Sequence, residues 1–173
     1  SPLIRNQATI GGNICTSSPI GDIAPILLTL SSEIITFSKK GQRKISIEKF
    51  FKSYRKNILY KHEIIEKIII RLPRNNQKLI SWKFSKRYDQ DISTLSVCFL
   101  YTLERNIIKE FQIAAGGIAE KPILLKNISK HLVGKNMEKS LETLIANMKS
   151  FINPISDLRG SAEYRINTFK GVF

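Results

Sequence analysis

The sequence predicts an α+β chain made of two parts that join near Pro73 to Lys78. Three observations support this fold class. Short β-rich runs separated by polar turns dominate the chain as far as Ala115, and apolar residues at helical spacing dominate after it. Between the two series of β-rich runs, Pro73 is followed by a purely polar stretch, which is typical of a linker.

The first part is expected to contain a short helix, a hairpin and further short elements. Asp22 to Leu30 is an apolar run with a carboxylate at its N-cap position and Pro25 in the permissive first turn. Glu33 to Ser38 is rich in β-branched residues and leads through a turn containing Gly41 into Lys44 to Ile47, which predicts a hairpin. The remaining elements are a short amphipathic helix at Glu48 to Tyr54 and a strand at Ile64 to Leu72.

The second part is expected to be a three-stranded meander followed by helices. The three extended runs are Leu79 to Lys86, Ser93 to Glu104 and Ile107 to Ala115. Apolar residues recur at helix spacing between Met137 and Phe151 and, more weakly, between Leu124 and Leu132. A last helix is expected to run to Phe173, with Ser156 and Asp157 as its caps.

The chain is strongly basic, with 28 Lys and Arg against 14 Asp and Glu and a net charge of +14. Such a balance can indicate a nucleic acid, an anionic membrane or an acidic partner. The basic residues are spread, however, and form only short clusters near Lys39 to Lys44 and Lys83 to Arg87, without the alternation of aromatic and basic residues that single-strand binders use. We therefore expect neither nucleic acid nor membrane as a partner.

The compartment is expected to be the cytoplasm. No segment approaches the roughly 18 consecutive apolar residues of a membrane helix. The first residues contain neither an initiator Met nor a signal peptide, so we interpret them as a cut within a longer chain. Cys15 and Cys98 lie far apart, and neither has a neighbouring histidine, which predicts free thiols and no zinc or iron–sulfur ligands.

The segment from Ala8 to Asp22 carries the most informative chemistry. Gly11 and Gly12 would let the backbone approach a ligand closely, and the small hydroxyl and amide side chains around them can bond phosphate or ribityl oxygens. We expect this segment to be a ligand-binding loop for a nucleotide. The alternative is a plain glycine-rich turn before a helix.

The run Ile4 to Asn13, followed by Ser18 to Asp22, resembles the second flavin-contacting loop of the xanthine dehydrogenase family of molybdenum hydroxylases. Further matches to that family follow in the same order along nearly the whole chain. They are Ser53 to Lys56, Glu63 to Ile65, Ser85 to Ser93, Gly116 to Ala119, and Pro154 to Arg159 with Tyr164 and Arg165.

The resemblance implies the second half of an FAD-binding domain of the PCMH/VAO type at residues 1–73. It implies a CO-dehydrogenase-flavoprotein-C-terminal-like domain, a three-stranded antiparallel sheet plus helices, at residues 78–173. It implies no catalytic residue or metal ligand in this chain, and it implies FAD contacts at Thr9, Ile10, Gly11, Gly12, Asn13, Thr16, Asp22, Ile65 and Lys83. For Ile65 and Lys83, an ordinary strand residue and a solvated lysine are equally open interpretations. Gly116 and Gly117 are interpreted as purely structural.

The function implied is electron transfer within a purine-oxidising enzyme of purine catabolism. Electrons would pass from a molybdopterin-binding large subunit through [2Fe-2S] clusters to FAD and then to NAD. The missing partner is an upstream iron–sulfur and FAD-binding segment that carries the other flavin loop. The loop Lys86 to Ile92 would lie near the flavin ring, but Tyr88 and Gln90 differ from animal-type relatives, so the details of NAD gating do not carry over. A hairpin turn with an ion pair between Arg87 and Asp91 is an equally open interpretation of this loop.

Two alternatives remain open at this point. The chain could be the flavoprotein subunit of a related hydroxylase that acts on carbon monoxide, aldehydes or nicotinate. It could also be a non-enzymatic, basic nucleic-acid-binding module, because of its charge.

Overall fold

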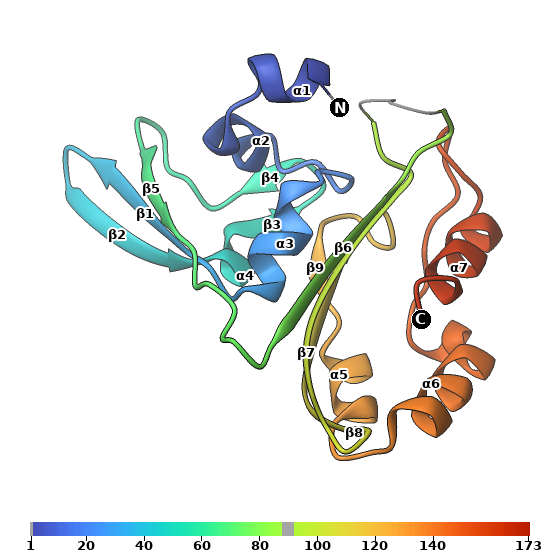
Figure 1. The fold of residues 1–173 in the computed structure, drawn as a ribbon. Helices are drawn as coiled ribbons and strands as arrows, with labels where there is room; N and C mark the ends of the chain where they lie inside the picture. Colours follow the sequence, from blue (N-terminus) through green and yellow to red (C-terminus); the bar gives the residue numbers. More distant parts are fainter. Residues whose placement is uncertain (1, 88–91) are drawn as a thin grey trace.

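The structure, a computed structural model, describes residues 2–87 and 92–173. Its centre is a four-stranded antiparallel sheet in the order β6-β7-β8-β9 (Figure 1). The strands span Lys78–Phe84, Leu95–Glu104, Ile107–Gly116 and Ile123–Leu124. The predicted meander is therefore confirmed, and the short strand β9 extends it by one strand.

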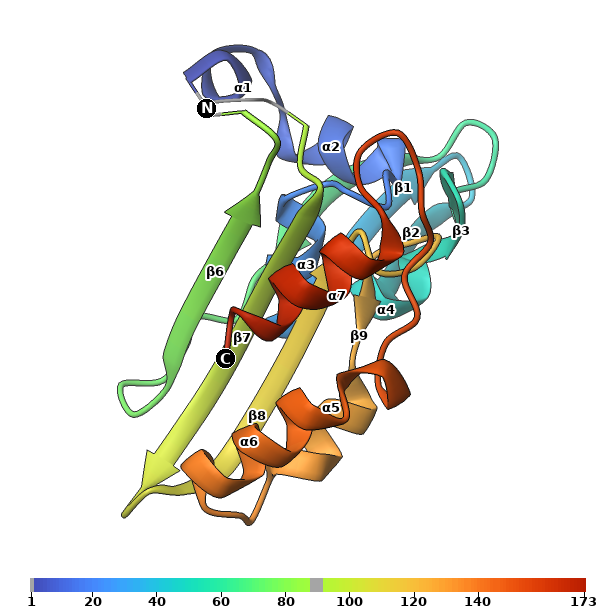
Figure 2. The ribbon, with the colours of Figure 1, turned by 90° about the vertical axis from the view of Figure 1, so that its right-hand side faces the viewer.

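Helices cover one face of this sheet (Figure 2). They are α5 at Lys126–Leu132, α6 at Met137–Ala146, the 3-10 turn η1 at Met148–Ser150, and α7 at Ala162–Lys170. The larger core forms here, because Leu95, Val97 and Phe99 alternate along β7 and pack against residues such as Ile128 and Leu144 from the helices.

The opposite face of the sheet packs on α3, at Ile23–Thr29, which belongs to the first part of the chain. Small residues allow the close approach: Ala114 joins the core of the first part, and the Thr29 hydroxyl donates to the Cys98 carbonyl oxygen at 2.9 Å. Gly117 has a φ of +91°, and a Cβ there would lie 2.4 Å from the Thr94 oxygen. The glycine is therefore required by packing, which agrees with its structural interpretation.

The first part builds a second, three-stranded antiparallel sheet in the order β2-β1-β5. Its strands are β1 at Glu33–Ser38, β2 at Gly41–Ser46 and β5 at Ile64–Ile69. A β-hairpin of β3 at Phe51–Ser53 and β4 at Lys56–Asn57 lies beside it, together with the helices α1 at Pro2–Gln7, α2 at Ile10–Thr16 and α4 at Ile47–Phe50. The core here is smaller and centres on Ile14, Leu27, Ile34 and Phe50.

Several expectations about local elements were wrong. Ile10 to Asn13 is not a loop but the first turn of α2, because the Thr9 side chain caps the helix. The helix expected at Glu48 to Tyr54 is only the four-residue α4, after which the chain enters β3. The last helix has Ser161 rather than Asp157 as its N-cap and ends at Lys170, but the Ser156 hydroxyl does accept from the backbone N–H of Ala162, its first residue, at 2.9 Å.

Both cysteines are free thiols, as expected. Cys98 is fully buried in β7, and burial raises the pKa of its thiol to about 11. No helix among residues 2–87 and 92–173 is long and apolar enough to cross a membrane. Within the same residues, no cluster of three or more His, Cys, Asp or Glu side chains has the arrangement of a metal site.

Candidate functional site

Asp22 stands at the junction between the two parts of the chain. It is the residue before α3, but its carboxylate does not cap that helix. Instead, one carboxylate oxygen accepts from the Ser93 hydroxyl, and the other lies 2.7 Å from the Lys83 ammonium. Lys83 is in β6 and Ser93 precedes β7, so the second part of the chain orients this carboxylate. The structure thus brings together Asp22 and Lys83, two residues that were predicted separately.

The Asp22 side chain remains accessible in this arrangement. It is 28% exposed, and that of Lys83 is 29% exposed, whereas Ser93 is 1% exposed. A carboxylate oxygen has more than one lone pair, so both oxygens can accept a further hydrogen bond. The arrangement therefore fixes the direction of Asp22 while leaving the carboxylate able to contact a ligand.

The glycine-rich segment presents its polar groups from α2 rather than from a loop. The Thr9 hydroxyl accepts from the Gly12 backbone N–H at 3.1 Å, and the Thr16 hydroxyl donates to the Gly12 carbonyl oxygen at 2.9 Å. A Cβ on Gly12 would lie 2.8 Å from the Thr9 hydroxyl oxygen, so this glycine lets the cap form. Gly11 differs, because nothing lies within 4 Å of the Cβ position there. The backbone at Gly11 is thus open to an incoming group.

Asn13 carries the clearest sign of a missing partner. Its side-chain oxygen is buried and accepts no hydrogen bond from any described residue. It lies beside Gly21, where a Cβ would be 3.4 Å away, and Gly21 immediately precedes Asp22. Buried polar atoms in native proteins nearly always have a partner, so the orphaned oxygen indicates a donor that the described residues do not supply.

The remaining predicted contacts divide into two groups. Ile10 is 49% exposed at the start of α2, so its side chain is available to a ligand. Ile65 lies in β5 opposite Thr36 and packs against the core that contains Ile14. The structure therefore supports the interpretation of Ile65 as an ordinary strand residue at least as well as a ligand contact.

Sequence reasoning missed Ser93 as a member of this site. A single serine at the start of a strand carries no signal of its own, and only the fold brings it to Asp22, 71 residues away in sequence. Near this site, the Lys86 ammonium donates to the Leu158 carbonyl oxygen at 2.8 Å. The expected roles of Tyr88, Gln90 and Asp91 in the loop after Lys86 lie outside the described residues.

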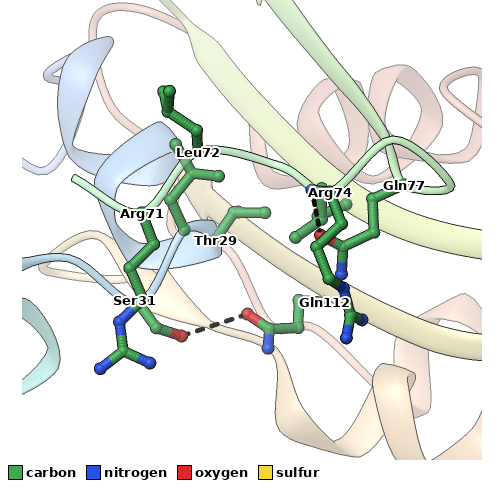
Figure 3. A pocket seen from close by; sticks show the side chains of 9 residues that line it. Thr29, Ser31, Arg71, Leu72, Arg74, Gln77 and Gln112 are labelled. Carbon is green, nitrogen blue, oxygen red and sulfur yellow. Dashed lines mark hydrogen bonds between the residues drawn. The ribbon is translucent and has the colours of Figure 1, made fainter.

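A pocket with a cavity volume of about 280 Å³ opens at the other end of α3 (Figure 3). Thr29 and Ser31 line it together with Arg71, Arg74 and Gln112, and the Ser31 hydroxyl donates to the Gln112 side chain at 3.3 Å. None of the predicted flavin contacts borders this pocket. It marks the far end of the junction between the two parts and belongs to a different surface from the Asp22 site.

Two family models match the chain in succession. Residues 1–74 match the FAD binding domain in molybdopterin dehydrogenase, and residues 80–173 match the CO dehydrogenase flavoprotein C-terminal domain. The chain is 34% identical to a xanthine dehydrogenase of Blastobotrys adeninivorans, over 94% of its own length and 12% of that protein. It is 32% identical to the glyceraldehyde dehydrogenase medium chain of Sulfolobus acidocaldarius, over 96% of its length and 59% of that protein.

A solved structure shares the same fold. The carbon monoxide dehydrogenase from Hydrogenophaga pseudoflava superposes with a TM-score of 0.90 over 99% of this chain and 60% of the matched chain, at 20% sequence identity. Each of these relatives extends well beyond the region that the present chain matches.

Proposed function

The chain belongs to the FAD-binding flavoprotein family of the molybdopterin dehydrogenases, and on this premise we propose that Thr9, Gly11, Asn13 and Asp22 form one half of its FAD site. The single observation that carries the proposal is that the Asp22 carboxylate forms an ion pair with Lys83 and a hydrogen bond with Ser93. Residues predicted as contacts from two separate segments lie together at this junction, beside an oxygen that lacks a donor.

The residues present fit a flavin nucleotide. FAD offers N–H and O–H donors from its ring and its ribityl chain, which suit the orphaned Asn13 oxygen and the Asp22 carboxylate. The open backbone at Gly11 can admit a bulky group without a clash. When FAD is bound, it supplies the electron-transfer chemistry, and the protein supplies orientation and electrostatics.

The roles of the side chains follow from their contacts. Ser93 and Lys83 hold the Asp22 carboxylate in one direction, so that the carboxylate is prearranged before the ligand arrives. The Lys83 ammonium offsets the negative charge of Asp22, which would otherwise oppose an electron-rich, reduced flavin. Because the flavin carries the electron-transfer chemistry itself, the proposed function requires no acid–base pair from this chain.

For the whole protein, we propose an oxidoreductase that takes electrons from a molybdopterin centre through iron–sulfur clusters to FAD. The partners would be an upstream segment with the iron–sulfur and remaining FAD contacts and a molybdopterin-binding subunit, in the cytoplasm. Xanthine as substrate is supported by the likeness to a xanthine dehydrogenase. NAD as acceptor is proposed from the sequence resemblance alone. The nearly equal identity to a glyceraldehyde dehydrogenase medium chain favours an aldehyde as the second candidate substrate.

Expression of this chain with its upstream segment and the molybdopterin-binding subunit tests the proposal. We expect a purified complex with a flavin absorption spectrum, bleached by xanthine and restored by NAD. Asp22→Asn should weaken FAD retention by about tenfold or more, since a hydrogen bond to a charged group contributes roughly 1.5–3 kcal/mol. Asn13→Ala should weaken it less, by a few-fold to about tenfold, since a hydrogen bond between neutral groups contributes roughly 0.5–1.5 kcal/mol. Lys130→Gln, an exposed change on α5, is the control and should leave the flavin content unchanged.

The possible results distinguish the proposed substrate from the proposed FAD site. Bleaching by an aldehyde but not by xanthine would assign the substrate to the second candidate and leave the FAD site intact. A colourless complex with normal molybdenum content, or full flavin content in both site variants, would overturn the site itself.

A further inference from the structure

A cleft with a volume of about 650 Å³ lies at the tip of the β1–β2 hairpin, on the first part of the chain. It is lined by the hairpin turn from Phe37 to Lys40 and by the segment from Tyr60 to Ile64. Pockets of this size accommodate ligands as large as nucleotides. None of the residues predicted to contact FAD borders it.

The cleft combines positive charge with exposed apolar surface. Lys39, Lys40 and Lys61 line it, and none of the three forms an ion pair with a residue that the structure describes. Between them lie Tyr60, which is 66% exposed, and Phe37, which is 48% exposed. Three unpaired ammonium groups around aromatic rings suit a ligand that carries both phosphate groups and a flat ring.

A buried carboxylate fixes the shape of one wall. Glu63 is 8% exposed, and it accepts hydrogen bonds from the Tyr60 backbone N–H at 2.8 Å, from the Thr36 hydroxyl and from the Arg43 guanidinium. The hydrogen bonds from Arg43 lower the pKa of Glu63 to about 2, so the carboxylate is charged at neutral pH. The turn that presents Tyr60 and Lys61 is therefore anchored rather than loose.

Arg43 also orients the tyrosine ring. Its guanidinium carbon lies 4.2 Å from the centroid of the Tyr60 ring, in a cation–π contact. Because the ring is still 66% exposed, the part that Arg43 does not cover is available for stacking. On the facing wall, the Ser38 hydroxyl accepts from the Lys40 backbone N–H at 3.2 Å and Gly41 has a φ of +102°, which shape the turn that carries the two lysines.

We propose that this cleft is a binding site for a nucleoside diphosphate, separate from the flavin site. The base would stack on Tyr60 and contact Phe37, and the phosphates would bind the ammonium groups of Lys39, Lys40 and Lys61. A diphosphate carries several negative charges in a small volume. It therefore matches the three unpaired lysines better than a ligand with a single carboxylate would. The ring accounts for the exposed aromatic surface, which inorganic phosphate would leave unused.

Calorimetric titration of the 173-residue chain with ADP, adenosine and pyrophosphate tests the proposal. We expect ADP to bind at least tenfold more tightly than either of its halves, which corresponds to about 1.4 kcal/mol. Amide chemical shifts recorded during the ADP titration should change at residues 37–41 and 60–64. The affinity should fall as salt is added, because the lysines bind phosphate groups.

Variants with matched controls assign the contacts. Lys39→Gln with Lys40→Gln should weaken ADP binding at least tenfold, whereas Lys130→Gln with Lys149→Gln removes the same charge elsewhere and should leave it unchanged. Tyr60→Ala should weaken binding severalfold and Tyr60→Phe less than twofold, because the ring is retained. Asn13→Ala should have no effect, which separates this cleft from the flavin site.

Other results would overturn the proposal. Equal affinity for ADP and pyrophosphate would reduce the cleft to an anion patch without ring recognition. Competition by single-stranded oligonucleotides with an affinity that rises with length would assign the surface to nucleic acid. Absence of ADP binding at millimolar concentration, with the chain shown to be folded by circular dichroism, would remove the site altogether.

Discussion

The strands β5 and β7 are both rich in large apolar residues but have opposite surroundings. β7 is buried over Leu95 to Leu100, because α3 lies on one face of its sheet and α5 to α7 lie on the other (Figure 1). β5 is one of the two edge strands of the smaller sheet, and Ile64 and Ile69 are 63% and 40% exposed. The same kind of sequence therefore builds a complete core in the second part and leaves apolar surface uncovered in the first.

The exposed apolar residues at and after β5 indicate where a further protein segment packs against the first part. Exposed apolar residues continue past the end of β5 to Leu72, which is 83% exposed. Several exposed large apolar residues within one segment are a common feature of interaction surfaces. Together with the orphaned oxygen of Asn13, it supports the proposal that a further protein segment and FAD complete the first part.

Replacing one leucine by alanine in β7 and one just after β5 should give the largest difference in the free energy of unfolding. Leu95 is fully buried in β7, so Leu95→Ala should reduce the free energy of unfolding by about 2–5 kcal/mol through lost contacts and a cavity. Leu72→Ala should change it by less than about 0.5 kcal/mol, because the side chain already contacts water. Urea unfolding followed by circular dichroism measures both. Equal losses would mean that Leu72 is buried in solution, by a second copy or otherwise.

The smaller core should depend more on electrostatics, and Glu63 is the residue that tests this. Glu63→Gln should cost roughly 1–3 kcal/mol, because Arg43 loses its partner while the Tyr60 N–H and the Thr36 hydroxyl keep weaker acceptors. The loss is limited because the Arg43 side chain is 32% exposed and water can solvate it.

The pH dependence of this variant gives an independent check. The folded pKa of Glu63, about 2, lies below the ordinary value of 4.5, so its contribution is complete above about pH 4.5 and is lost as the pH falls toward 2. The difference in unfolding free energy between the unmodified chain and Glu63→Gln should therefore shrink across that range. A difference that stays constant down to the lowest measurable pH would contradict the assignment.

The smallest effect is expected at the junction itself. Asp22 and Lys83 are both partly exposed, so a double-mutant cycle of Asp22→Asn and Lys83→Met should give a coupling energy of about 0.2–1 kcal/mol in unfolding. A coupling well above this range would mean that the pair holds the two parts together, in addition to orienting a carboxylate.

Local sequence patterns predicted the elements that packing supports. Glu33 to Ser38 forms β1 with the predicted ends, and the meander follows the alternation of its buried residues. The patterns failed where a single contact decides the structure. Ile10 to Asn13 became helical because Thr9 caps it, and the segment after Phe50 became a strand because it pairs with β4.

The candidate site was predictable only in part. The glycine-rich segment and Asp22 stood out through their residue types and their resemblance to a known family. The pairing of Asp22 with Lys83, and the role of Ser93, depend on how α3 packs against the larger sheet, and no local pattern encodes that packing. Ser93 reaches Asp22 across 71 residues of sequence, and only the fold brings the two side chains together.

Calorimetric titration with FAD, of the chain alone and of the chain joined to its upstream segment, tests the central claim that this chain holds one half of a flavin site. We expect the chain alone to bind FAD weakly or not at all, since losing several hydrogen bonds to charged groups, each worth roughly 1.5–3 kcal/mol, weakens binding by orders of magnitude. The longer protein should bind one FAD tightly. Submicromolar binding of one flavin by the chain alone would contradict the account.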